Sequence, residues 1–125
     1  MRYGINTCDS LSSDRVRLEY ATLDHAEAIY RVGDPETFRL MAARPSPWSD
    51  DGCRAYLHKF LEDEHTVQYS AFDQESGELV GGTSYYDIRP MHRGLEIGST
   101  WVAPQFRRRR FNAEMKLLML GQAFD

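Results

Sequence analysis

The sequence predicts an α+β fold, and three observations lead to that prediction. The expected elements follow the order strand, helix, helix, three strands and helix, which mixes the two types without regular alternation. A short segment at 74–78, QESGE, separates two strand-like runs and is typical of an antiparallel hairpin. The composition, 42% hydrophobic and 27% charged over 125 residues, is that of one globular domain with a single core.

The N-terminal third of the chain is expected to form a strand and a helix after a polar arm. Residues 1–14 are expected to be a loose arm without an apolar signal-peptide core, which favours a cytoplasmic location. Val16–Tyr20 alternates apolar and polar side chains and therefore predicts a strand. Thr22 or Asp24 provides an N-cap for the helix that follows, and this helix is expected to stop near Gly33.

The middle of the chain predicts a second helix and a β-hairpin. Two prolines make the segment 44–51 a loop, because proline fixes the backbone and removes a donor. Residues 51–63 place apolar side chains at helical spacing and predict an amphipathic helix. The runs 67–73 and 79–87 predict two strands, joined by a turn in which Gly77 supplies the open backbone angle.

The last third of the chain predicts a strand, a basic loop and a helix. Gly81 and Gly82 in the preceding strand indicate a bulge or a close backbone approach. Residues 95–102 predict a fourth strand, in which Gly98 is a further bulge site. A helix is expected over 112–124, with Asn112 as its cap, and its apolar side chains cover so wide an arc that it must be largely buried.

Charge is concentrated in the loop before this last helix. The chain carries a net charge of −4, yet four arginines, 107–110, are consecutive. A helix N-terminus beside guanidinium groups suits a small anion such as a pyrophosphate, whereas the acidic remainder repels a long polyanion. From the residues alone, a solvated basic loop or a nucleic-acid patch explains the run equally well.

No metal site is expected. Cys8 and Cys53 lack metal-ligand spacing, and nothing in their positions indicates a disulfide. The four histidines form no motif and are expected at the surface; they are His25, His58, His65 and His92.

The segment LEIGSTWVAPQFRRRRFNAEMKLLMLGQAF resembles the signature of the GNAT superfamily of N-acetyltransferases. The resemblance is closest to the branch of the ribosomal-protein N-acetyltransferases (RimJ/RimL type). In that branch a strand similar to E-I-G-x-T-W leads through a pyrophosphate loop into a helix similar to N-x-E-x-K-x-L-L-L. VRLEYATLDHAEAIY resembles the first strand and helix of the family, and GELVGGTSYYDI its third strand, so the resemblance covers nearly the whole chain.

The resemblance implies one GNAT-like domain over 1–125, with a mixed, mostly antiparallel sheet flanked by helices and without the family's C-terminal strands. It implies acetyl-CoA as cosubstrate and a primary amine as acceptor, either a small molecule or a protein N-terminus. A non-catalytic acyl-CoA-binding or assembly module is the alternative. A small nucleic-acid-binding protein is less favoured, because basic and aromatic residues are not interleaved. Neither nucleic acid nor membrane is expected as a partner.

The cofactor-binding residues implied by the resemblance lie in two groups. Backbone groups near the end of the fourth strand bind the pantetheine arm in the family; here these are Trp101, Val102 and Ala103. The loop pattern Q/R-x-x-G-x-G/A falls on Arg107, Arg108, Arg109, Arg110, Phe111 and Asn112. Arg110 departs from this pattern, because a glycine there would let backbone amides approach a phosphate closely.

Glu96 is the candidate catalytic base, since the resemblance places a carboxylate near the start of the fourth strand. A solvent-facing strand residue or a salt-bridge partner is the alternative interpretation. Tyr85, Tyr86 and Asp87 are expected either to line the acceptor side or to pack. The acid that protonates the leaving thiolate usually lies in the family's C-terminal part, so no residue is assigned to that role.

A homodimer is expected because the family's C-terminal strands are absent. Without a later strand, the fourth strand leaves unpaired N–H and C=O groups at a sheet edge. The last helix is apolar around much of its surface and needs a cover, which a two-fold partner would supply.

Overall fold

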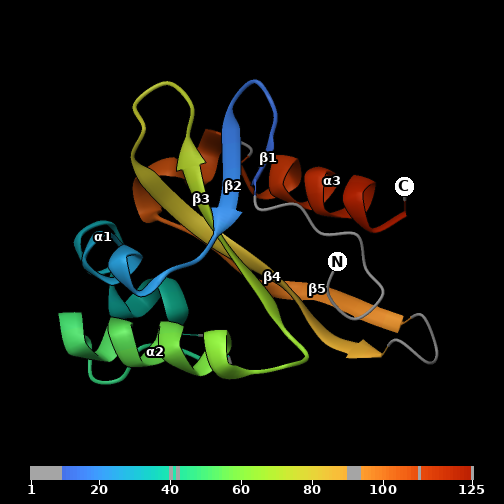
Figure 1. The fold of residues 1–125 in the computed structure, drawn as a ribbon. Helices are drawn as coiled ribbons and strands as arrows, with labels where there is room; N and C mark the ends of the chain where they lie inside the picture. Colours follow the sequence, from blue (N-terminus) through green and yellow to red (C-terminus); the bar gives the residue numbers. More distant parts are fainter. Residues whose placement is uncertain (1–9, 40, 42, 90–93, 110, 125) are drawn as a thin grey trace.

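A computed structural model describes residues 10–39, 41, 43–89, 94–109 and 111–124 (Figure 1). The elements follow in the order β1 (Ser10–Ser12), β2 (Val16–Tyr20), η1 (Leu23–His25), α1 (Ala26–Val32), η2 (Pro35–Phe38), α2 (Asp50–Glu62), β3 (Val67–Asp73), β4 (Leu79–Arg89), β5 (Gly94–Val102), η4 (Pro104–Arg109) and α3 (Phe111–Phe124), where η marks a 3-10 helix.

The five strands form one antiparallel sheet in the order β1-β2-β3-β4-β5. Helices α1 and α2 pack against one face of this sheet, and α3 packs against the other (Figure 1). The predicted α+β class, with an antiparallel sheet flanked by helices, is therefore confirmed. Strand β5 lies at one edge of the described sheet, as expected for the fourth predicted strand.

Residues 10–12 correct the expectation of a loose arm over 1–14, because they form β1. Leu11 pairs with Leu18 of β2 and packs against the core, so the segment gains both a ladder and apolar burial. The amide of Ser13 donates to the carbonyl of Val16 at 2.8 Å and closes the turn between the two strands. Residues 1–9 lie outside the described residues.

The face of the sheet under α3 is apolar. Val16 and Leu18 alternate with charged neighbours along β2, Ala71 of β3 pairs with Leu18, and all three are fully buried. Met115 and Met119 of α3 are buried as well. The expectation that α3 is largely buried is not met on its outer side, where 69% of Leu117 and 44% of Leu120 is accessible beside the exposed Lys116.

The opposite face carries an aromatic cluster between the sheet and the α1–α2 layer. Phe38 of η2 is its centre: its ring centroid lies 4.9 Å from Trp101, 5.6 Å from Tyr56 and 5.8 Å from Trp48. Aromatic pairs at such separations are favourable beyond their area burial. The cluster joins η2 and α2 to the end of β5, which is where the candidate site begins.

Two local features follow from sequence chemistry. Gly77 adopts a φ of 77° in the β3–β4 turn, as predicted for that position. The last helix begins at Phe111, one residue earlier than expected, so Asn112 lies inside its first turn and is not the cap.

None of the described helices has both the length and the apolar character needed to cross a bilayer.

Candidate functional site

The candidate site is the continuous segment formed by β5, η4 and the start of α3. β5 is an edge strand of the described sheet, η4 follows directly, and α3 then runs back across the sheet (Figure 1). This arrangement places a free strand edge beside a helix N-terminus, where backbone N–H groups lack intrahelical partners. Such a helix end attracts anions.

The pairing of β5 with β4 is interrupted near its centre. Gly82 pairs with Trp101, but Ser84 pairs with Gly98, so β5 has one residue more than β4 between these two pairs. The extra residue is a β-bulge at 99–100, which disrupts the ladder and bends the strand. The hydroxyls of Thr83 and Thr100 remain 2.8 Å apart across the two strands, so Thr100 is a cross-strand partner.

Gly81 and Gly82 are required where β4 approaches the end of β5. An ideal Cβ at Gly81 would lie 2.3 Å from the carbonyl oxygen of Trp101. An ideal Cβ at Gly82 would lie 2.6 Å from the indole nitrogen of Trp101. The glycine pair thus marks a close backbone approach, as predicted from the sequence.

The three residues expected to hold the pantetheine arm have different surroundings. The side chain of Trp101 is 4% exposed and belongs to the aromatic cluster. The amide of Ala103 donates to the carbonyl of Val80 at 2.7 Å, and its carbonyl accepts from Phe106 at 2.9 Å. Ala103 therefore has both backbone groups engaged within the fold, and its amide is not a donor for a ligand.

Val102 is the residue of this group that faces the free edge. Successive residues of a strand turn their backbone groups to opposite sides, and the Trp101 carbonyl and the Ala103 amide both turn toward β4. The carbonyl of Val102 instead accepts from the Nε of Arg107 at 3.3 Å. Strand alternation thus leaves Val102 to present backbone groups along the edge.

Arg107 is exposed and lies between this edge and η2. Its neighbour across the gap is Asp34, the N-cap of η2. Hydrogen bonds from Thr37 are the main cause that lowers the pKa of the Asp34 carboxyl, and the charge of Arg107 lowers it further. The charge of Arg107 thus reaches Asp34, which the position of Asp34 before Pro35 in the sequence does not reveal.

The remaining loop residues divide into packing and surface positions. Phe111 is buried and meets Phe106 edge-on at 5.7 Å between ring centroids, so its side chain anchors the start of α3. Asn112 is exposed in the first turn of α3. Arg108 and Arg109 belong to η4, but their side chains are not described, and Arg110 lies outside the described residues.

Glu96, the predicted base, is exposed on β5 and pairs in register with Tyr86 of β4. Paired residues share one face of an antiparallel sheet, and here it is the face of Trp101 and Gly82. Tyr86 is partly buried on that face. The side chain of Asp87 is not described.

Tyr85 is on the other face, so of its two expected roles, lining the acceptor side or packing, the structure shows packing. Its side chain is fully buried, and its hydroxyl donates to the carbonyl of Met119 in α3. Adjacent strand residues point to opposite faces, so only one of the two tyrosines can face an acceptor. Tyr85 is a packing residue that holds α3 on the sheet.

An apolar hollow lies beside the proline-containing loop at 44–51. It has a volume of about 460 Å³, and Phe38 and Trp48 form its apolar part. Arg39 and Arg44 lie at its rim, where an Arg44 guanidinium nitrogen donates to the Arg39 carbonyl at 2.8 Å. Trp48 also packs against Tyr30, with 5.8 Å between ring centroids, so it both packs and lines the hollow.

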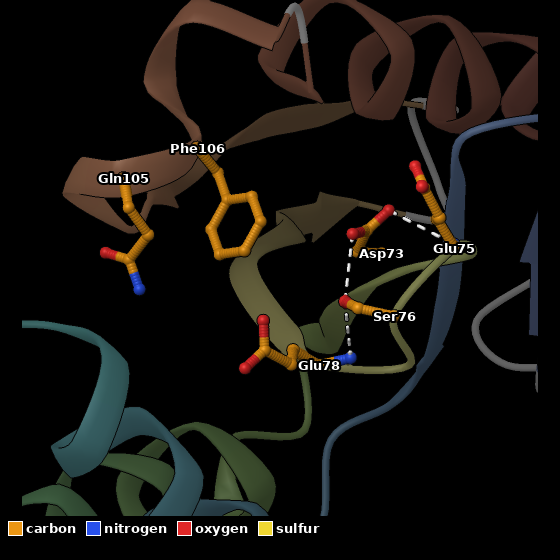
Figure 2. Close-up of a pocket in the computed structure, with 6 residues that line it drawn as sticks. All are labelled: Asp73, Glu75, Ser76, Glu78, Gln105 and Phe106. Carbon is orange, nitrogen blue, oxygen red and sulfur yellow. Dashed lines mark hydrogen bonds between the residues drawn. The ribbon is translucent and has the colours of Figure 1, made fainter.

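A second hollow, of about 440 Å³, lies between the β3–β4 turn and η4 (Figure 2). Its lining is acidic, with Asp73, Glu75 and Glu78 on the turn. The Asp73 carboxylate accepts from the Glu75 amide at 3.2 Å and from the Ser76 hydroxyl at 2.9 Å, so it organises the turn. Among the described residues, no cluster of His, Cys, Asp and Glu side chains is arranged to hold a metal ion.

Comparisons with known proteins agree with this geometry. Residues 15–125 match the acetyltransferase (GNAT) domain. A solved structure from T. thermophilus, assigned to the acetyltransferases, is 30% identical with a TM-score of 0.86; the match covers 94% of this chain and 61% of that one. A search of curated proteins finds no match.

Two more distant structures share the fold. A GCN5-related N-acetyltransferase from Brucella melitensis is 22% identical, with a TM-score of 0.80 and coverage of 93% of this chain and 54% of that one. A structure from Vibrio cholerae assigned as a ribosomal-protein-serine acetyltransferase is 14% identical, with a TM-score of 0.76 and coverage of 99% and 69%. The chain spans about 60% of the length of the first solved structures that it matches. With the domain match over residues 15–125, the chain belongs to the GNAT acetyltransferase family.

Proposed function

We propose that this chain binds acetyl-CoA and takes part in acetyl transfer to a primary amine, and that within the family it lies on the RimJ/RimL-type branch. The observation that carries the proposal is the edge of β5 beside Arg107 and the N-terminus of α3. The branch assignment rests on the motif EIGSTW at 96–101 and on the helix that follows it.

The residues present fit the chemical parts of CoA. The amide of Val102 at the strand edge suits a carbonyl of a pantetheine arm, as it would suit one more strand. α3 has 14 residues, so its N-terminus carries a full helix dipole toward a pyrophosphate. Arg107 is exposed and adds a charge-assisted bond, because a guanidinium pairs well with phosphate oxygens.

The proposed chemistry assigns one proton transfer to Glu96. A protonated amine is not a nucleophile, so the Glu96 carboxylate first accepts a proton from the ammonium nitrogen. The amine nitrogen then forms a bond to the thioester carbonyl carbon, and the C–S bond breaks. The nitrogen loses its second proton as the amide forms, the thiolate gains one proton, and the products are an N-acetyl amine and CoA. Glu96 is exposed, which lets it exchange its proton with solvent after each turnover.

The binding half of the proposal is tested by calorimetry with CoA and with pantetheine. CoA should bind more tightly, because only CoA carries the phosphates that meet Arg107 and the α3 amides. Arg107→Ala should weaken CoA binding by about 10-fold or more, the worth of a hydrogen bond to a charged group, and leave pantetheine binding unchanged. Arg31→Ala, which removes an exposed arginine of α1, is the matched control. Equal affinity for CoA and pantetheine would contradict the proposed phosphate site.

The catalytic half is tested by Glu96→Gln, which keeps the size of the side chain and removes the base. Turnover of an amine acceptor should fall by about 10²–10⁴-fold while CoA affinity stays close to that of the wild type. An unchanged rate would return Glu96 to a solvent-facing role. Titration with an oligonucleotide tests the nucleic-acid alternative, and CoA binding without transfer to any amine would favour the non-catalytic module.

We also propose that the chain forms a homodimer. The Val102 end of the β5 edge is proposed for the pantetheine arm, so the surface proposed for pairing is the final helix, α3. Leu117 and Leu120 of α3 expose apolar surface that a partner would cover. Light scattering at micromolar concentration should give twice the monomer mass of 14.5 kDa, and a stable monomer would contradict this proposal.

A further inference from the structure

Tyr86 of β4 lies across Gly98 of β5. The three atoms nearest to an ideal Cβ at Gly98 all belong to Tyr86: its Cε1 at 2.5 Å, its hydroxyl oxygen at 3.0 Å and its Cζ at 3.1 Å. Tyr86 pairs with Glu96 and not with Gly98, so its ring leans diagonally along the sheet. The lean carries the hydroxyl from the Glu96 position toward the bulge at 99–100.

Gly98 is the residue that permits this position. Any larger residue at 98 would place its Cβ where the ring edge of Tyr86 now lies, and the ring would have to rotate away. The sequence predicts only a bulge at Gly98, yet the extra residue of β5 comes after it. The absence of a side chain at 98 therefore serves the placement of the tyrosine.

The hydroxyl of Tyr86 and the carboxylate of Glu96 share one face of the sheet. Directly paired residues in an antiparallel sheet have Cβ atoms about 4.5–5.5 Å apart, so the two side chains leave the sheet next to each other, and the Tyr86 ring leans from there toward Gly98. This is the face that Trp101 and Phe38 occupy nearer to α2, whereas α3 covers the opposite face. Tyr86 is only partly buried and Glu96 is exposed, so both reach solvent.

Two oxygen acceptors on one face of the sheet match the chemistry of an ammonium group. An ammonium has several N–H donors, a carboxylate takes one of them and removes its proton, and a phenolic hydroxyl accepts another. With both contacts made, the nitrogen is fixed next to β5 and close to the bulge. A single carboxylate on an exposed strand would leave the nitrogen free to rotate, and misplacement is costly for a reaction that needs alignment.

We infer that Tyr86 contacts the acceptor ammonium and positions it for Glu96, and that Gly98 leaves the space in which the tyrosine ring lies. This inference rests on the proposed function for the identity of the acceptor. Its structural basis, the Tyr86–Gly98 contact and the Tyr86–Glu96 pair, is independent of CoA.

Binding of an ammonium probe tests the inference without any acetyl transfer. Protein with ¹³C-labelled tyrosine rings is titrated with n-butylammonium chloride, and n-butanol serves as the uncharged control. The ring signal that is missing in Tyr86→Phe should shift saturably with the ammonium and not with the alcohol. It should lose this response in Glu96→Gln and in Gly98→Ala. No response to the ammonium, or the same response to the alcohol, would overturn the inference.

Kinetics separate the inference from the proposed function. With an amine that is acetylated, Tyr86→Phe should raise the KM for the amine by about 10-fold, the worth of a hydrogen bond to a charged group, and leave the KM for acetyl-CoA unchanged. Gly98→Ala should act in the same direction, and Tyr85→Phe, on the opposite face, should change neither constant. Wild-type kinetics in Tyr86→Phe would sink the inference while the proposed function stands. A specific ammonium response without any acetyl transfer would uphold the inference and defeat the proposed function.

Discussion

Replacement of Tyr85 by phenylalanine should destabilise the fold without touching the candidate site. The hydroxyl of Tyr85 donates to the Met119 carbonyl and accepts from the Gln122 side chain at 3.0 Å, in a side chain that is fully buried. Each buried hydrogen bond contributes about 0.5–1.5 kcal/mol net, so the two together are worth about 1–3 kcal/mol. Gln122 also donates to Tyr69 at 3.2 Å and keeps that partner, which places the expected loss near the middle, at about 2 kcal/mol.

The assay is thermal or urea unfolding of Tyr85→Phe beside Tyr86→Phe. A loss of about 2 kcal/mol should lower the Tm of a domain of this size by about 8 °C. Tyr86→Phe removes the same atom from the next residue, but from a partly exposed side chain on the opposite face, and should stay within about 0.5 kcal/mol of the wild type. Equal stability of the two variants would refute the assignment of the two tyrosines to opposite faces, and the inference about Tyr86 would fail with it.

Three further predictions concern other parts of the fold. Gly81→Ala should lower the free energy of unfolding by about 1–3 kcal/mol, because the new Cβ meets the Trp101 carbonyl oxygen. Gly121→Ala should raise it by about 0.5–1 kcal/mol, because the new Cβ in α3 meets open space and alanine favours a helix. Urea denaturation in which both changes have the same sign would contradict this pair of predictions. Burial lowers the pKa of His25 below its ordinary value of about 6.5, so protonation favours the unfolded state. The contribution of neutral His25 to the free energy of unfolding should be complete above pH 6.5 and be lost as the pH falls through the pKa of His25 in the folded state. Urea titrations at several pH values that show the same pH dependence in His25→Gln as in the wild type would argue against this prediction. Burial raises the pKa of the Cys53 thiol to about 11. In a Cys8→Ser background, Cys53 should therefore react with a disulfide reagent near neutral pH far more slowly in the native than in the unfolded protein. Equal rates in the two states would exclude a buried thiol.

The elements with a clear local signal were predictable from the sequence. Val67–Asp73 has the predicted bounds, because its apolar character and the turn chemistry around Gly77 are both local properties. β1 was missed because SLS has only three residues, too few to establish an alternating pattern. Its pairing depends on Leu18, a partner that the segment itself does not reveal.

The candidate site was only partly predictable, because its contacts join residues from different elements. Period-2 alternation implies that Tyr85 and Tyr86 point to opposite faces, but it does not say which face meets α3. The proximity of Asp34 and Arg107 arises because η2 packs against β5, and no spacing in the chain encodes that contact. The engagement of the Ala103 amide by Val80 likewise depends on the register of β4 with β5.

The acidic hollow beside η4 bears on how the arginine loop would be used. Asp73, Glu75 and Glu78 lie on the turn next to η4, and Gln105 and Phe106 of η4 complete the lining (Figure 2). Exposed charges interact over about 8 Å at physiological ionic strength, so this side of the loop repels phosphate. A long polyanion would have to pass both this turn and the Asp34 carboxylate that faces Arg107, whereas a pyrophosphate needs only the surface between Arg107 and the first turn of α3. The same acidic turn makes a salt test informative: added salt should weaken CoA binding modestly, since few phosphates are engaged, while a nucleic-acid site of several contacts would show a steep dependence.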